Sequence, residues 1–332
     1  MTPVQTCVAV AAGVLALSSA GLPHARPAPG VSRSAERILA NQNRAPAGRL
    51  RGGVLTLDLE LRTGMFRPHA DDGPGIEVQA FGERGRALQI PGPLIRVPEG
   101  TAIHATIRNR LRDSTLVLHG FAPHRGAAGD SLVIPPGATR TVRFDAGRAG
   151  TYYYWGTTTG KHMEDERWVD SQLSGAFIVD PAGTPPPADE RVFVMGVWLK
   201  PPDSASADPG GEFMVINGKS WPETERLKYT VGDTVRWRWL NPTSSSHPMH
   251  LHGFYYEVDS RGSWAADTVY PPAGRRMVVT ELMPPGGTMT TRWMPARPGN
   301  WLFHCHFAFH IADAQLLSAE PGAASGHDGA HP

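Results

Sequence analysis

The residues best suited to chemistry lie in two short stretches of the last third of the chain, HPMHLHGF and HCHFAFHIADAQL. A thiolate with two imidazoles forms a trigonal set that suits copper, because soft sulfur favours copper over calcium or magnesium. Cys305 and His310 are close in sequence, and His247 from the distant stretch completes such a set. The other histidines of the two stretches are His250, His252, His304 and His306. Zinc is the alternative metal, since sets of cysteine and histidine also bind it; two His-x-His pairs, one of them straddling the cysteine, favour copper.

Extended backbone would sort these side chains onto two faces. Residues two apart in a strand face the same side, and adjacent residues face opposite sides. His304 and His306 therefore point one way and Cys305 the other. His250 and His252 likewise share a face. The pattern predicts a thiol on one side of a strand and paired histidines on the other.

The chain has only two cysteines, Cys7 and Cys305. Cys7 lies in an apolar stretch, residues 7–17, that is followed by small residues, which predicts a signal peptide over residues 1–25. We therefore expect an exported protein, periplasmic or extracellular, whose mature form has one cysteine and no internal disulfide. Cys305 is then either an inert buried thiol or a metal ligand, and its histidine neighbours favour a ligand.

The elements that must position these residues are short strands. Strand-like runs such as 54–59, 103–107 and 141–144 are separated by turns rich in proline and glycine. Short strands with regular turns are typical of a β-sandwich or barrel. No long stretch has a helical period, so the sequence predicts an all-β fold.

The chain divides at the sequence DPAGTPPPADE, residues 180–190, and its two halves resemble each other. Residues 94–111 are echoed by 227–241, and residues 134–154 by 283–303. A repeat of this length indicates two copies of one fold. We expect a flexible lead over residues 26–52, a first domain over 53–181, a linker over 182–190, a second domain over 191–318 and a disordered tail over 319–332.

Composition excludes some function classes. The 32 basic residues nearly balance the 31 acidic ones, and no basic run occurs, so we expect neither a nucleic acid nor a membrane surface as partner. Hydrophobic residues make up 40% of the 332 residues, enough for two domains with their own cores.

Over residues 53–318 the sequence resembles the multicopper oxidases, specifically the two-domain small-laccase type with its blue copper in the second domain. The resemblance implies two tandem cupredoxin-like Greek-key β-sandwich domains. It implies His247, Cys305 and His310 as ligands of a type 1 copper, with Gln315 at the axial position. An axial glutamine would lower the potential of that copper. The other implied ligands are His250 at a type 2 copper and His252, His304 and His306 at a type 3 pair.

The first domain departs from the family pattern, which places four further histidine ligands there. The first expected pair falls in TLVLHG, where Val117 replaces one ligand and His119 remains. The second falls in GTYYYWGTTTG, where Trp155 and Thr157 take both positions. Valine and tryptophan cannot bind copper, and threonine is a poor ligand for it. One type 1 copper is therefore expected, and the number of further copper ions stays open.

Two histidines could replace lost ligands. His124 lies five residues beyond His119, and His162 lies five beyond Thr157. Either loop could swing inward, or both histidines could be solvated. Trp155 could fill the vacated space or relay an electron, and close packing favours the first role.

Three functions stay open. The resemblance implies a laccase-like oxidoreductase that takes single electrons from a small-molecule or protein donor at the type 1 copper. They would pass through Cys305, His304 and His306, with oxygen as acceptor at an altered interdomain copper cluster. The alternatives are a mononuclear blue-copper electron-transfer protein and a copper-binding or storage protein.

The resemblance also bears on assembly and on one related family. It implies a homotrimer, in which each cluster lies between one chain's first domain and the next chain's second. A copper nitrite reductase fits less well, because that family has its blue copper in the first domain, where this chain has no cysteine.

Overall fold

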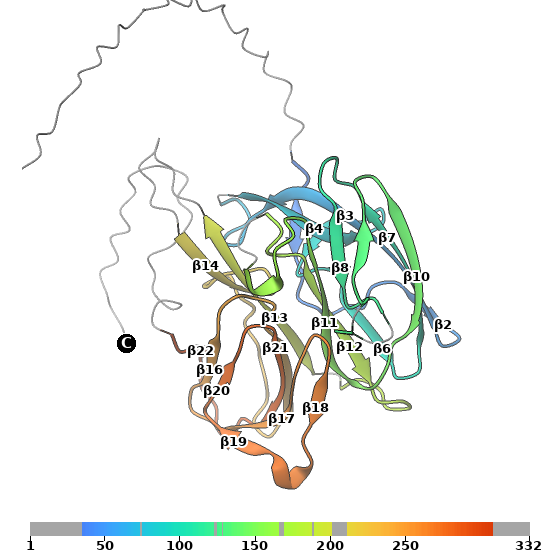
Figure 1. Cartoon of the computed structure of the whole chain (residues 1–332). Coiled ribbons are helices and arrows are strands. Elements are labelled where there is room, and N and C mark those ends of the chain that lie inside the picture. The colour runs from blue at the N-terminus through green and yellow to red at the C-terminus, as the bar shows by residue number, and fades with distance from the viewer. Residues whose placement is uncertain are drawn as a thin grey trace, which may run out of the picture. The chain divides into compact units, whose positions relative to one another are not determined.

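The structure, a computed structural model, describes residues 35–73, 75–122, 125–127, 129–165, 169–187, 189–200 and 211–307. The predicted signal peptide and the predicted tail lie outside the described residues. In this part of the chain the regular elements are strands and two short 3-10 turns, η1 (Met163–Asp165) and η2 (Pro272–Gly274). A helix of the length and apolarity that a bilayer requires does not occur there. The all-β prediction is confirmed (Figure 1).

One sheet of the first domain runs in the order β1-β5-β4-β3-β7-β10, with β2 paired to β3. Its strands are β1 (Ile38–Ala40), β2 (Arg49–Arg51), β3 (Val54–Phe66), β4 (Ile76–Glu83), β5 (Leu88–Ile90), β7 (Ala102–Asn109) and β10 (Thr139–Asp145). Burial alternates along β7, where Ile103, Ala105 and Ile107 are buried. This period of two turns one face of the sheet towards an apolar core.

The second sheet of the first domain runs in the order β6-β12-β11-β8-β9. Its strands are β6 (Ile95–Pro98), β8 (Leu116–His119), β9 (Leu132–Ile134), β11 (Gly150–Thr157) and β12 (Ser174–Asp180). Every residue of β11 and β12 is buried. These two strands are therefore covered on both faces, whereas β7 alternates.

The flexible lead expected over residues 26–52 is wrong for its described part. β1 pairs in parallel with β5, and β2 pairs with β3. Ala47 is buried in the first core, and the Asn43 side-chain amide donates to Asn217 Oδ1 in the second domain at 3.0 Å. The segment lacks an obvious period because its strands have three residues each, too short to show one.

The second domain has one large and one small sheet. The large sheet runs β14-β13-β15-β21-β17-β18, with β19 on β17, and the small sheet runs β20-β16-β22. The strands are β13 (Arg191–Lys200), β14 (Gly211–Ile216), β15 (Val235–Leu240), β16 (His247–Leu251), β17 (Tyr256–Ser263), β18 (Asp267–Val269), β19 (Arg276–Val278), β20 (Thr280–Met283), β21 (Gly287–Trp293) and β22 (Phe303–Cys305). Side chains from both sheets meet in an aromatic core that includes Trp237, Trp239 and Tyr256.

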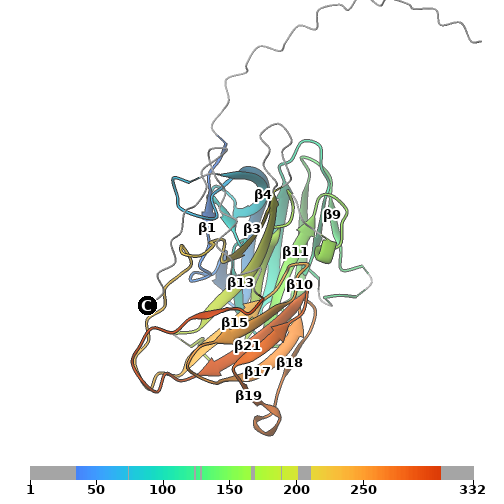
Figure 2. The same ribbon diagram turned by 90° about the vertical axis from the view of Figure 1, so that its left-hand side faces the viewer.

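The two domains meet where β11 of the first lies against β15, β17, β18 and β21 of the second (Figure 2). The Thr151 N–H donates to Asp267 Oδ2 at 2.8 Å, and the Tyr153 hydroxyl donates to the Gly286 carbonyl at 2.9 Å. These bonds explain why β11 is buried on both faces. The outward face of β11 is the surface by which the first domain holds the second.

Ion pairs at the ends of the linker support this seam. Arg96 binds Asp180 at 2.8 Å and Glu190 at 2.6 Å, and Arg238 from β15 binds Glu190 at 3.0 Å. The Glu190 side chain is 2% exposed, and the two guanidinium groups are its ion-pair partners. The residues that flank the linker therefore take part in fixed contacts.

Candidate metal centre

The two histidine-rich stretches lie side by side as β16 and β22. The antiparallel register sets Met249 opposite Cys305 and His250 opposite His304. The His306 N–H donates to the Pro248 carbonyl at 2.7 Å and carries the ladder past the cysteine. Alternation then divides the side chains between an inner and an outer face, as the sequence pattern predicts.

The inner face carries Cys305, Met249 and His247. Met249 and His247 are buried, each 1% exposed, and Cys305 packs against the aromatic core of the second domain. His247 is the diagonal neighbour of Cys305 across the ladder, a position within reach of long side chains. The Thr243 hydroxyl lies 3.1 Å from His247 Nε2 and fixes the ring. A partly buried thiol and a buried imidazole thus share one face.

Burial also acts on the thiol. It raises the pKa of Cys305, and the backbone N–H of Phe307 opposes that shift. A thiol in this state is a weak nucleophile, and it needs a cation to deprotonate fully. Cys305 therefore has the surroundings of a metal ligand more than those of a reactive cysteine.

The outer face carries the four other histidines, which form the histidine face: His250, His252, His304 and His306. Their ring centroids are 4.9 to 5.7 Å apart in neighbouring pairs. His252 Nε2 lies 3.0 Å from His304 Nε2. Two ligand nitrogens on one ion lie at most about 4 Å apart, so this pair has the spacing of a shared ligand pair.

Hydrogen bonds on the opposite ring nitrogens hold two of these imidazoles. His250 Nδ1 lies 2.7 Å from the Thr280 hydroxyl, and His304 Nδ1 lies 2.7 Å from the Cys305 carbonyl. Such outer bonds set the tautomer and orient ligand histidines. Burial first, and then the neighbouring imidazoles, lowers the pKa of His250; burial also lowers that of His304. Both rings are therefore neutral at neutral pH, as metal ligation requires.

The described residues fit a copper ion on the inner face in part. Cys305 and His247 supply sulfur and nitrogen donors of the kind copper prefers. His310 and Gln315, the other predicted ligands, lie outside the described residues. Within the described ranges, no three or more histidine, cysteine, aspartate or glutamate side chains form a complete metal-binding group.

The four first-domain positions that the family fills with histidine converge on one pocket. Val117, His119, Trp155 and Thr157 all line a cavity of about 410 Å³. The β8–β11 ladder sets Trp155 opposite His119 and Thr157 opposite Val117. Three of these four side chains cannot serve as good copper ligands. This half of the site does not fit the family's three-copper cluster, and we derive no step through such a cluster.

Trp155 occupies the space that a ligand pair would need. Its ring stacks on His119 with centroids 4.1 Å apart and planes at 13°, and it is 3% exposed. His162 lies edge-on to Trp155 at 5.4 Å and lines the same pocket. His124, the other proposed replacement, lies outside the described residues. The first domain thus brings two histidines, His119 and His162, to one cavity.

Sequence reasoning missed several residues of both sites. Trp264, from the second domain, and Asp130 line the first-domain pocket. Thr243 and Thr280 hold ligand-type histidines by their hydroxyls. A polar residue in NPTSSSHP could have suggested a partner for His247, since threonine commonly bonds nearby groups. Nothing in the sequence places Trp264 beside His119, because tertiary contact alone joins them.

Comparisons with known proteins agree with this arrangement. Residues 197–318 and 86–183 each match a family model described as Multicopper oxidase. A probable nitrite reductase-hydroxylamine oxidoreductase fusion protein of Kuenenia stuttgartiensis is 26% identical over 80% of this chain and 31% of its own length. Laccase-1 of Botryotinia fuckeliana is 31% identical over 33% of this chain and 21% of its own length. The chain thus spans about a third or less of these curated relatives.

Solved structures show the same fold. The multicopper oxidase mgLAC superposes with a TM-score of 0.60 at 25% identity, covering 77% of this chain and 80% of that one. A copper nitrite reductase from Nitrosomonas europaea gives a TM-score of 0.59 at 20% identity over 77% of this chain and 90% of that one. The predicted pair of cupredoxin-like β-sandwiches is confirmed. With both halves matched by family models, the chain belongs to the multicopper oxidase family.

Proposed function

We propose that this protein is a laccase-like copper oxidoreductase, in which Cys305 and His247 would hold a copper ion that accepts single electrons and oxygen would be the final acceptor, reached through the histidine face. One observation carries the proposal. The strand β22 directs Cys305 into the second core while its neighbours His304 and His306 lie on the opposite face. One short covalent path thus joins a partly buried thiol to two imidazoles.

The residues around this strand suit electron transfer. A copper ion on Cys305 and His247 would supply reversible one-electron chemistry. Met249 and Phe303 belong with Cys305 to the aromatic core, and the Thr243 hydroxyl lies 3.1 Å from His247 Nε2. Ligands that are held by packing and hydrogen bonds need little rearrangement when the charge of the ion changes.

The assembly that we propose is a ring of chains, a homotrimer by resemblance. In the first domain the outward residues Tyr153 and Trp155 are 0% and 3% exposed, because the second domain covers them. By the internal repeat their counterparts are Leu302 and His304, and Leu302 is 45% exposed. If the same head-to-tail contact also forms between chains, it gives a ring when its rotation closes on itself. A second copy would then cover the histidine face and bring His119 towards it.

The test combines copper per chain, visible and electron spin resonance spectra, and oxygen uptake with a phenolic donor. The copper-loaded protein should show the intense visible band of a copper–thiolate bond and should consume oxygen. Cys305→Ser should lose both. The double variant His304→Ala/His306→Ala should keep the band and lose at least nine-tenths of the oxygen uptake, while His104→Ala in β7 should match the parent. Absence of the band in the parent protein would overturn the proposal.

A second function, a one-electron carrier, is favoured by the first-domain pocket. Val117 and Trp155 leave His119 as the remaining family ligand on the two ladder strands. One copper per chain with the visible band and no oxygen uptake would establish the carrier. Copper bound without that band would instead indicate a binding or storage protein.

A further inference from the structure

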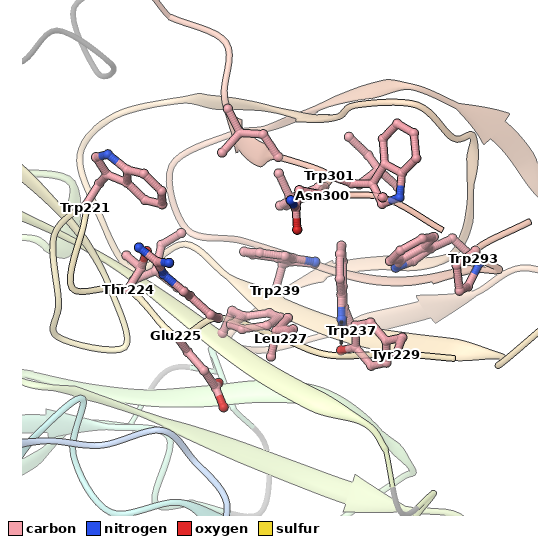
Figure 3. A pocket seen from close by; sticks show the side chains of 18 of the residues that line it. Trp221, Thr224, Glu225, Leu227, Tyr229, Trp237, Trp239, Trp293, Asn300 and Trp301 are labelled. Carbon is pink, nitrogen blue, oxygen red and sulfur yellow. Dashed lines mark hydrogen bonds between the residues drawn. The ribbon is translucent and has the colours of Figure 1, made fainter. Parts of the chain in front are cut away.

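Cys305 and His247 share one face of the small sheet, but their surroundings differ. Cys305 packs against aromatic rings that include Trp237 and Trp239, and these two rings also line a groove of about 750 Å³ (Figure 3). His247 is buried, and a hydroxyl group contacts its ring. Packing holds a ring in place, but a hydrogen bond selects which of the two imidazole nitrogens carries the hydrogen. The polar neighbours of His247 therefore decide which nitrogen can bind an ion.

These polar neighbours begin at Asn241, a fully buried residue that directly follows β15. Its side-chain nitrogen Nδ2 donates to the Pro284 carbonyl at 2.8 Å and to the Ser245 carbonyl at 2.9 Å. Carbonyl oxygens only accept hydrogen bonds, so these two contacts settle which end of the amide is nitrogen. Asn241 Oδ1, at the other end of the amide, is therefore an acceptor.

The buried Thr243 hydroxyl is the next group in this series of hydrogen bonds. It lies 2.7 Å from Asn241 Oδ1, and because that oxygen only accepts, Thr243 donates its single hydrogen there. The Ser245 carbonyl, at 3.2 Å from the hydroxyl, is a second acceptor that would share the same hydrogen. A hydrogen turned towards His247 instead would break the bond to a buried acceptor, which is costly. The hydroxyl therefore meets His247 with a lone pair.

The hydrogen on His247 follows from this direction. His247 Nε2 lies 3.1 Å from the Thr243 hydroxyl oxygen, so Nε2 must carry a hydrogen and donate it to that oxygen. A neutral imidazole has one N–H, and its other nitrogen has the lone pair that a metal ion requires. In His247 that other nitrogen is Nδ1.

The first domain shows that the fold itself does not require this arrangement. Asn109 is the counterpart of Asn241 in the internal repeat, is likewise buried, and also donates to two backbone carbonyls. Its Oδ1 accepts the Leu111 N–H at 3.0 Å. Leu111 is the counterpart of Thr243, and its side chain packs in the first core. The asparagine thus supports both sandwiches, whereas the hydroxyl occurs in the domain that has the candidate metal centre.

We propose that Thr243, oriented by Asn241, is a positioning residue that fixes the Nε2–H form of His247 and thereby selects Nδ1 as the nitrogen that binds the metal ion. The hydrogen position is a property of the polypeptide and holds in metal-free protein. The part that concerns the ion rests on the proposed function. Hydrogen bonds to the outer nitrogen of a ligand histidine orient its ring, so losing this one should weaken metal binding.

Nitrogen NMR of metal-free protein with isotope-labelled histidine measures the hydrogen position directly. The His247 signals are identified by their loss in His247→Gln. The parent should show a protonated Nε2 and an unprotonated Nδ1, and Thr243→Ser, which keeps the hydroxyl, should show the same. Thr243→Val should shift the ring towards a mixture of both forms. An Nδ1–H form in the parent, or an unchanged ring in Thr243→Val, would refute the proposal.

Copper affinity measures the consequence for the ion. In competition with a chelator, followed by the visible copper–thiolate band, Thr243→Val should bind copper about 10- to 100-fold more weakly than the parent, and Thr243→Ser within about threefold of it. Thr291→Val is the matched control and should bind like the parent, because the buried Thr291 hydroxyl has no hydrogen-bond partner in the described part of the chain.

Equal affinities of Thr243→Val and the parent would show that the hydroxyl does not position His247 for the ion. Absence of the band in the parent would contradict the proposed function instead, and the nitrogen signals of His247 would still decide the hydrogen position. The two measurements thus separate failure of this inference from failure of the proposed function.

Discussion

The strand pair β8–β11 of the first domain and the strand pair β16–β22 of the second are counterparts, but their side chains have different roles. The sequence LHGF occurs at residues 118–121 and again at 251–254, so His119 and His252 are counterparts, and by the repeat so are Trp155 and His304. In the first domain the two rings stack and are covered by the second domain. In the second domain the two imidazoles face each other through ring nitrogens on a partly exposed face of the small sheet. Equivalent strand positions thus carry packed rings in the first domain and histidines suited to bind a metal in the second.

A shift of register accompanies this difference. His119 lies opposite Trp155, whereas the residue opposite His304 is His250, two positions before His252. A shift of two keeps every side chain on its own face, because the period of a strand is two. The second domain therefore gathers more imidazoles around one point without turning any of them inward.

The largest expected effect is the loss of the first-domain stack. Trp155→Ala should lower the free energy of unfolding by about 3 to 5 kcal/mol, because it empties a large buried site. His304→Ala, at the equivalent position, should lower it by less than about 1 kcal/mol in metal-free protein, because the side chain is partly exposed. Denaturant unfolding of both variants measures the difference. Similar losses of unfolding free energy in the two variants would mean that both residues act mainly by packing.

The seam that covers the first-domain face should be the next most sensitive. Arg96→Met leaves Asp180 and Glu190 buried with only Arg238 nearby, and should cost about 3 kcal/mol. Arg84→Met, at a guanidinium that is 60% exposed and 3.8 Å from Asp58, is the control and should cost less than about 0.5 kcal/mol. A small effect of Arg96→Met on urea unfolding would show that the seam does not depend on these charges.

The histidine face should respond to its supporting hydroxyl. Thr280→Val removes the partner of His250 Nδ1 and should weaken copper binding at this face by about 10- to 100-fold. Competition with a chelator measures the affinity, and Thr139→Val on β10 of the first domain is the control. If both threonine variants bind alike, His250 is not held by Thr280 for ligation.

The smallest effect concerns pH at the domain seam. Burial raises the pKa of Asp267, despite the bond from the Thr151 N–H. A carboxyl with a raised folded pKa contributes stability below its unfolded pKa and loses that contribution as pH rises through the folded pKa. Asp267→Asn should therefore gain stability relative to the parent between pH 4 and pH 7. A difference in unfolding free energy that is constant over this range would contradict the assignment.

Much of the molecule follows from the sequence alone. The all-β fold, the duplication and the opposed faces around Cys305 depend on local period and spacing, which are readable along one strand. The set of cysteine and histidine donors likewise indicates which metal ions could bind there. The exception is the segment of residues 35–51, whose three-residue strands carry no period and take their structure from β3 and β5.

Only the tertiary structure decided which residues lie next to the histidines of the first domain. His162 and Trp264 join His119 because a loop and a second domain fold against β11, and no spacing in the sequence encodes that contact. The covered face of β11 and the open face of β22 differ for the same reason. Strand pattern determines which side a residue takes, but long-range packing determines what it meets there.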